Sequence, residues 1–135
     1  MTTPHHIFNP EALAPPVGYS HAVSAGPGRT VYLGGQTGHD GDGKLVSDDL
    51  VEQFEKAASN VVVALKAAGA RPEHLVSLQI FVTDASEYTE VLSELAHGYR
   101  EHLGSHYPAV SLFEVSRLFD PEAKVELVGI AVVPS

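Results

Sequence analysis

The stretch DDLVEQFEKAASNVVVALKAAGARPEHLVSLQIFVT, residues 48–83, decides the fold because it holds the clearest helix and the clearest strand of the chain. In its first part, apolar side chains recur at steps of three and four residues, which predicts a helix over 48–68 with one buried face. The apolar positions are Leu50, Val51, Phe54, Ala57, Ala58, Val61, Val62 and Leu65. Ser47 or Asp48 can cap the start of this helix, and Gly69 can end it.

The second part, residues 75–83, alternates between two sets of side chains and predicts a strand. The set expected to face the helix is Val76, Leu78, Ile80 and Val82. Directly after this strand, Asp84 is followed three residues later by Glu87, which is typical of the start of a helix. We expect this second helix to end near Gly104.

The remaining elements are found by working outward from this stretch. Toward the C-terminus, alternating segments at 109–118 and 124–133 predict two strands separated by a proline turn. Toward the N-terminus, 19–25 and 30–33 predict a hairpin across the turn Gly-Pro-Gly-Arg. Residues 1–17 contain several prolines, which indicates an irregular lead-in.

This order of elements predicts a single α+β domain over residues 1–135, with the pattern ββαβαββ and both helices on one face of the sheet. The other face would then carry apolar side chains without a helix to cover them. These side chains are Phe81, Val128, Ile130 and Val132. We therefore expect copies of the chain to associate through this face.

Composition excludes several partners. Acidic residues outnumber basic ones by 17 to 8, and the net charge is −9, so we expect no nucleic-acid partner, because that partner needs clustered cations. No apolar run approaches the roughly 20 residues that cross a bilayer, so we expect no membrane partner. The absence of cysteine excludes disulfides and thiolate nucleophiles. Together with the lack of a secretory leader, it favours the cytoplasm.

Several short strings are spread over nearly the whole chain. They are Gly18-Tyr19-Ser20-His21-Ala22, Val31-Tyr32-Leu33-Gly34-Gly35-Gln36, Glu114-Val115-Ser116-Arg117-Leu118, and Val125-Glu126-Leu127 with Ala131-Val132-Val133. In this order and spacing they resemble the Rid family of reactive intermediate deaminases, also described as YjgF-type or L-PSP endoribonuclease-like proteins. The resemblance implies a chorismate-mutase-like fold of the bacillus type, a homotrimer, and small-molecule clefts between subunits.

The resemblance also implies a reaction. Active Rid proteins hydrolyse reactive imines and enamines, such as those released from serine or threonine by pyridoxal-phosphate enzymes. In those proteins an arginine after a Pro-Ala pair binds the substrate carboxylate, but here Val110 follows Pro108-Ala109. Loss of such a buried charged partner would cost roughly 2–5 kcal/mol. With Leu92 where active members often have an asparagine, the resemblance implies a more apolar cleft and a substrate other than the usual amino-acid-derived imines.

Candidate site residues follow from the same resemblance. Glu126 matches the acidic residue that positions water, and it is the candidate catalytic group; the alternative is a solvated strand glutamate. Tyr19 matches the pocket tyrosine, although its ring could simply pack. Backbone amides near Gly34 and Ser111 would hold the ligand beside Val110.

Arg117 and His21 complete the candidate ligand-binding residues. Arg117 could replace the missing cation, or it could pair with Glu114 or Asp120 as a structural ion pair. His21 lies two residues from Tyr19 and would share its side of the strand.

Three functions remain open at this stage. The first is a hydrolase acting on an imine, an enamine or a related electrophile. The second is a non-catalytic trimer that binds or senses a small molecule. The third is an endoribonuclease or translation inhibitor, against which the charge of −9 argues. The spacing of the eight histidines does not form a ligand set, so we expect neither a metal nor a cofactor.

Overall fold

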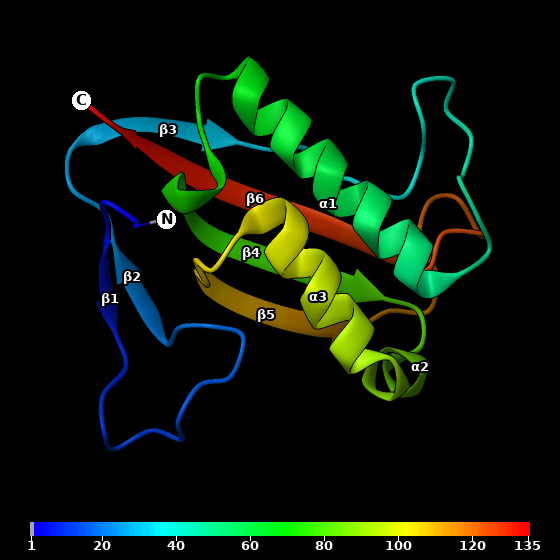
Figure 1. The fold of residues 1–135 in the computed structure, drawn as a ribbon, viewed down its shortest axis with the longest axis horizontal. Helices are drawn as coiled ribbons and strands as arrows, with labels where there is room; N and C mark the ends of the chain where they lie inside the picture. Colours follow the sequence, from blue (N-terminus) through cyan, green and yellow to red (C-terminus); the bar gives the residue numbers. More distant parts are fainter. Residues whose placement is uncertain (1) are drawn as a thin grey trace.

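Helices α1 (Leu50–Ala67) and α3 (Leu92–Leu103) lie side by side on one face of a four-stranded sheet (Figure 1). This computed structural model describes residues 2–135. Across the sheet the strands are β3 (Gly28–Tyr32), β6 (Val125–Pro134), β4 (Leu75–Val82) and β5 (Ala109–Glu114). The fold is therefore the predicted mixed α+β type, with helices on one face of a sheet.

Strand β6 lies between β3 and β4 and is antiparallel to both, whereas β4 and β5 are parallel. The unit β3–α1–β4 is thus a split βαβ unit, and the turn η1 (Pro72–His74) precedes β4. The short helix α2 (Ala85–Glu90) and α3 connect β4 to β5. The last two strands form as predicted, but they do not pair with each other: a parallel crossover places β5 beside β4 at the sheet edge, so β4 separates it from β6.

The predicted hairpin is wrong, because β2 (Ala22–Ser24) does not pair with β3. It pairs with β1 (His6–Phe8), and the two strands project from the main sheet as a ribbon (Figure 1). Just before β2, Ser20 bridges to Ala109 at the start of β5. Because β5 and β3 form opposite edges of the sheet, residues 20–28 must cross from one edge to the other and cannot turn back on themselves.

The N-terminal residues are attached to the domain. Strand β1 lies within 1–17, so that lead-in is not wholly irregular. The hydroxyl of Thr3 donates to Glu73 O at 2.7 Å, and the ring nitrogen Nε2 of His5 lies 2.8 Å from His74 O. The lead-in is therefore held against η1.

The N-cap of helix α1 lies one residue after the later of the two positions predicted from the sequence. The carboxylate of Asp49 accepts a hydrogen bond from the Glu52 N–H at 3.0 Å and is the N-cap in place of Ser47 or Asp48. Gly69, with φ +76°, follows the last turn as predicted. The left-handed conformation at this position favours glycine.

The second predicted helix is divided in two. Asp84 caps α2 by accepting from the Glu87 N–H at 3.0 Å, as predicted, and α3 ends at Gly104. Between them Val91 has φ −113° and ψ 25°, which interrupts the helical path. None of the helices within residues 2–135 is long and apolar enough to cross a membrane.

One core lies between the helices and the sheet. Its fully buried side chains include Phe54, Val61, Leu65, Leu75, Leu78, Val82, Leu95, Leu103, Val125 and Leu127. A register shift between Leu75 and Ser77 makes Val76 the bulged residue of β4. Leu75 therefore takes the buried position predicted for Val76, which is only half-buried.

The opposite sheet face carries no helix within residues 2–135. Phe81 pairs in register with both Phe113 and Glu126, so these three side chains share that face. The two phenylalanine rings stack with centroids 5.5 Å apart, and Tyr32 on β3 is 77% exposed. The predicted position of Phe81, Val128, Ile130 and Val132 away from the helices is confirmed by this register.

Candidate functional site

An apolar cavity of about 440 Å³ lies between the β5 edge of the sheet and the α2–α3 segment. Val110 on β5 and Tyr19 from the segment before β2 both contribute to its wall. Leu92, at the start of α3, lines it as well. The structure therefore brings together three positions at which the sequence indicated a pocket.

Tyrosines form much of the cavity wall. The Tyr99 hydroxyl donates to His106 O at 2.7 Å, and burial raises its pKa. Burial also raises the pKa of Tyr88 to about 12, so both phenols are neutral at physiological pH. Neither phenol therefore brings a charge to the cavity, and the hydroxyl hydrogen of Tyr99 is already donated within the chain.

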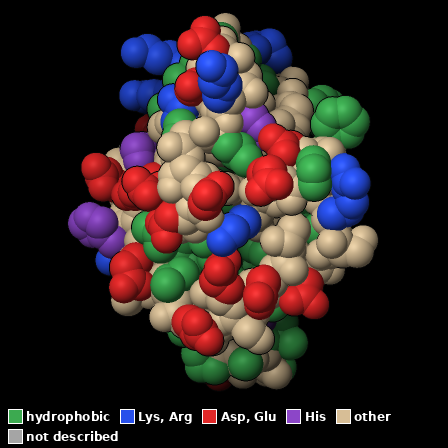
Figure 2. All heavy atoms as spheres, turned by 90° about the vertical axis from the view of Figure 1, so that its right-hand side faces the viewer, with side chains coloured by type: hydrophobic (Ala, Val, Ile, Leu, Met, Phe, Trp, Pro, Cys, Tyr) green, Lys and Arg blue, Asp and Glu red, His purple; other side chains and the backbone are tan. Residues whose placement is uncertain are grey.

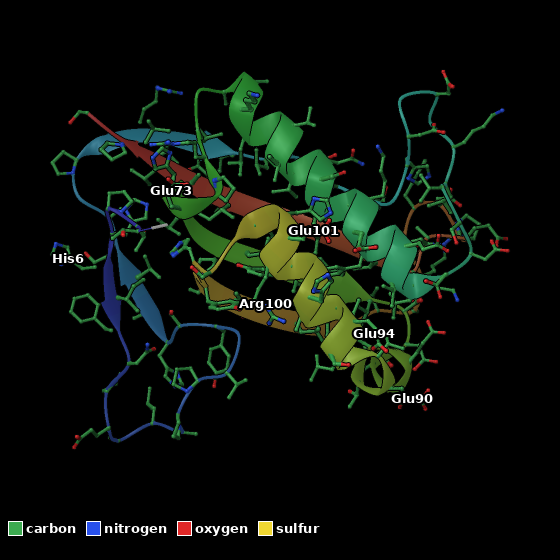
Figure 3. The ribbon with its side chains drawn as sticks, viewed as in Figure 1. His6, Glu73, Glu90, Glu94, Arg100 and Glu101 are labelled. Carbon is green, nitrogen blue, oxygen red and sulfur yellow. The ribbon has the colours of Figure 1, made fainter. Side chains whose placement is uncertain are left out.

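Arg100 is the one charged residue that lines this cavity within the part of the chain that the structure describes. It lies in the last turn of α3, four residues after Ala96 and eight after Leu92, and all three line the cavity. Figure 3 shows Arg100 on the side of α3 that lies over β5, whereas Glu101 lies on the side toward α1. The cavity thus has apolar walls and a single cation.

Glu126 belongs to a different hollow, of about 490 Å³. Its carboxylate lies directly against Gly35, where a Cβ atom would have no room. Around it, the Thr37 hydroxyl and the Asp120 carboxylate both contact the His39 ring, the latter with Oδ2 2.8 Å from Nε2. The backbone N–H of Glu122 and the His39 ring hold the pKa of Asp120 below its usual value.

This chain of contacts fixes the His39 ring. With Nε2–H donating to Asp120, Nδ1 can accept from the Thr37 hydroxyl. The Asn60 side chain donates to the carbonyls of both Thr37 and His39, at 3.0 and 2.9 Å, and holds their backbone in place. The His39 ring is therefore held in one orientation, and it lines the same hollow as Glu126.

Val110 and Glu126 lie on opposite faces of the sheet. Val110 pairs in register with the buried Leu78, on the helix face. Glu126 pairs with Phe81, on the uncovered face, and β4 separates the two strands. One chain alone cannot bring these two residues to the same small ligand, so a shared site requires a second copy.

The other predicted site residues line neither hollow. Gly34 is exposed after β3, and Ser111 is exposed on the uncovered face of β5. The Arg117 guanidinium donates to Leu118 O at 3.1 Å and to Phe119 O at 2.8 Å, and it forms no ion pair with a residue that the structure describes. His21 packs edge-on against Tyr19, with ring centroids 5.2 Å apart.

The structural ion pair considered for Arg117 does not form. Glu114 instead accepts a hydrogen bond from the Ala85 N–H at 2.9 Å, and Asp120 contacts His39. Arg117 therefore stabilises its own loop.

Known proteins share this fold. The crystal structure of a Rid-family protein of unknown function from Yersinia pestis superposes with a TM-score of 0.87 and 31% sequence identity, covering 96% of this chain and 98% of that one. A family model described as endoribonuclease L-PSP matches residues 9–133. This chain belongs to the Rid family. The resemblance seen in its short strings is thereby confirmed.

Other Rid relatives carry names. A 2-iminobutanoate/2-iminopropanoate deaminase from Capra hircus is 32% identical over 124 residues, which cover 91% of this chain and 83% of the relative. The RutC family protein UK114 from Drosophila melanogaster is 34% identical over 130 residues, covering 96% of this chain and 89% of the relative.

Sequence reasoning within the Rid framework missed two features of the hollows. Arg100 was not singled out, although Leu92 was, and the helical spacing of four and eight residues was the signal that could have found it. The contact between His39 and Asp120 joins positions 81 residues apart, so no local pattern could have predicted it.

A possible cation position lies outside both hollows of this Rid protein. Glu55 on α1 comes close to Glu101 and His102 on α3, with potential ligand atoms within 4.8 Å of one another. Two carboxylates and an imidazole could bind a divalent ion. Glu101 is exposed and lies 3.6 Å from the His97 ring, and no further observation points to an ion there.

Proposed function

We propose that this chain hydrolyses an imine, an enamine or a related electrophile in clefts shared by neighbouring copies of a homotrimer. Membership in the Rid family supports this proposal, as do relatives named 2-iminobutanoate/2-iminopropanoate deaminase. The observation that carries it is the division of the candidate residues between two hollows on opposite sheet faces. One hollow has the apolar walls to bind a ligand, and the other has the carboxylate to activate water.

The reaction needs one group that transfers protons and others that orient the ligand. Glu126 of one copy would accept a proton from water while the water oxygen bonds to the imine carbon of a ligand held in the next copy. The same carboxyl then gives this proton to nitrogen, which yields a carbinolamine. It next accepts the proton of the carbinolamine hydroxyl and passes it to nitrogen, so that the carbon–nitrogen bond breaks and a carbonyl compound and ammonia leave. An enamine first takes a proton on carbon to become the imine. Tyr19 and backbone amides near Gly34 and Ser111 would orient the ligand.

The substrate should differ from the small imines of serine and threonine. Val110 and Leu92 give the cavity apolar walls where the family resemblance implies an arginine and an asparagine. Such walls favour a ligand with an apolar body.

The test measures hydrolysis of a broad panel of imines, generated in place by an amino-acid oxidase, in a reducing buffer at neutral pH. Wild-type protein should hydrolyse at least one of them. Glu126→Gln should lower kcat by roughly a hundredfold or more, because it removes the proton acceptor. Glu122→Gln is the matched control, since its side chain is exposed in the neighbouring loop and lines neither hollow. Absence of turnover across the panel would refute the proposal.

A second candidate function is a non-catalytic trimer that binds or senses a small molecule. It is favoured by Val110, which leaves the cavity without a carboxylate-binding group on β5. Val110→Arg distinguishes the two functions. If the substitution creates hydrolysis of 2-iminopropanoate in a protein that otherwise has none, the natural chain is a scaffold that has lost this activity.

The endoribonuclease description of the family model is the third candidate. Figure 2 shows Asp and Glu side chains spread over the middle and lower parts of this end of the molecule, whereas Lys and Arg gather mainly toward its top. Such a face repels phosphates, which argues against an RNA substrate. We propose instead a cytoplasmic enzyme that acts on small molecules. RNA binding that weakens steeply with salt would revive this candidate.

A further inference from the structure

Among residues 2–135, the cavity lined by Val110 has one charged group, Arg100. Arg100 takes part in none of the four ion pairs found within residues 2–135. The adjacent Glu101 lies on the other side of α3 (Figure 3).

The position of Arg100 suits it to bind an anion at the cavity mouth. Its side chain is exposed but lines the cavity together with Leu92 and Val110. A guanidinium presents two parallel N–H donors that match the two oxygens of a carboxylate. Beside apolar walls, this pairing is screened less than it would be in open water.

We infer that the ligand of this cavity is a small carboxylate with a branched or aromatic body, held by Arg100. This assignment rests on the proposed function and names its substrate class: the imine of a larger apolar amino acid, or an anion of the same shape. Arg100 supplies from helix α3 the carboxylate contact that Val110 does not supply from β5. Arg100 would therefore be a binding residue and a determinant of specificity.

The size of the cavity selects for the apolar body. A volume of about 440 Å³ falls in the range of small-molecule sites and is far larger than a three-carbon acid needs. Leu95, Ile80 and Leu112 line it and gain from apolar contact. Each methylene buried there should tighten binding roughly three- to fourfold.

Stable oxo acids, which share the shape of the imino acids, allow binding to be measured without turnover. Calorimetric titrations of the full chain would compare pyruvate, 4-methyl-2-oxopentanoate, phenylpyruvate and the methyl ester of phenylpyruvate. Wild-type protein should bind phenylpyruvate and 4-methyl-2-oxopentanoate more tightly than pyruvate, and phenylpyruvate more tightly than its ester.

Arg100→Ala should weaken binding of the two larger acids roughly tenfold to a hundredfold and leave the ester unchanged. Arg100→Lys should recover only part of that loss, because an ammonium group lacks the forked donor geometry. Lys66→Ala is the matched control: it removes one exposed cation from the end of α1, away from the cavity, and should change nothing.

The assignment is overturned if no oxo acid binds, if pyruvate binds as tightly as phenylpyruvate, or if Arg100→Ala binds the acids like wild type. The experiments can refute the ligand assignment and the proposed function independently of each other. Binding that depends on Arg100 in a protein without imine hydrolysis supports the ligand assignment and refutes turnover. Imine hydrolysis that Arg100→Ala does not change supports the proposed function and refutes the ligand assignment.

Discussion

At the scale of single residues, Gln53 connects α1 to the strand that carries Glu126. Its side chain is fully buried and makes three hydrogen bonds: Nε2 donates to Ser47 O and Glu122 O, and Oε1 accepts from the Lys124 N–H at 2.8 Å. Lys124 lies two residues before Glu126. Gln53 therefore fixes the entry into β6.

Gln53→Leu should lower the free energy of unfolding by about 1–3 kcal/mol, because it leaves a buried backbone N–H and two carbonyls without partners. It should also reduce imine hydrolysis through a displaced Glu126. Urea denaturation followed by circular dichroism measures the first effect. A change smaller than about 0.5 kcal/mol would show that these bonds are not needed.

Two buried histidines make stability depend on pH. Burial lowers the pKa of both His74 and His106, the first accepting from the Arg71 N–H at 3.0 Å and the second contacting Leu75 O at 2.7 Å. In the unfolded chain a histidine has a pKa near 6.5. Below that pH the unfolded state binds more protons than the folded state.

The free energy of unfolding should therefore be highest above about pH 6.5 and fall as the pH drops through the lowered folded-state pKa values. Urea titrations between pH 7.5 and pH 5.5 measure this dependence. His106→Gln keeps an amide that can donate to Leu75 O but cannot titrate, so it should flatten the curve. Stability that is constant or rises on acidification would contradict the prediction.

Single residues also show where sequence reasoning reaches its limit. Glu126 and Val110 were recognised because each lies in a string with a family counterpart. Their placement on opposite faces depends on strand order, which alternation within a strand does not reveal. Arg100 lies in none of the strings that carry the family resemblance, and it becomes a candidate only because helix α3 places it in the wall of the same cavity as Val110.

At the scale of elements, the cap of α1 is the sharpest test of local structure. Asp49 receives the Glu52 N–H, while its neighbour Asp48 is exposed and makes no such bond. Asp49→Ala should lower the free energy of unfolding by about 1 kcal/mol, as the loss of an N-cap does. Asp48→Ala is the matched control and should have little effect; equal losses in the two variants would refute the cap assignment.

The helices and strands predicted correctly are those whose sequence signals lie within a few neighbouring residues. The apolar spacing of 48–68 and the capping pair Asp84 and Glu87 fixed both helical segments, because each signal lies within a few residues. The hairpin across residues 26–29 failed for the opposite reason. The bridge from Ser20 to Ala109 spans 89 positions of sequence and draws the chain to the far edge of the sheet.

At the scale of the whole molecule, the uncovered sheet face and the two hollows both point to association of copies of the chain. Phe81 and Phe113 stack on a face that no helix covers within residues 2–135, and Glu126 lies on that same face. If the uncovered face of one copy packs at the β5 edge of the next, Glu126 of the first copy would lie near the cavity of the second. The association and the site are therefore one hypothesis.

The most direct test of that hypothesis is the activity of a mixture of two variants that are each inactive alone. Glu126→Gln removes the carboxylate, and Leu112→Trp places a larger side chain in the cavity from a lining position on β5 that is 40% exposed. The two proteins are unfolded and refolded together in equal amounts, and imine hydrolysis is compared with that of each variant alone. Shared sites in random trimers should recover about a quarter of wild-type activity, because one pairing in four joins an intact cavity to an intact carboxylate. No recovery, with mixed trimers verified by mass spectrometry, would contradict a site built from two copies.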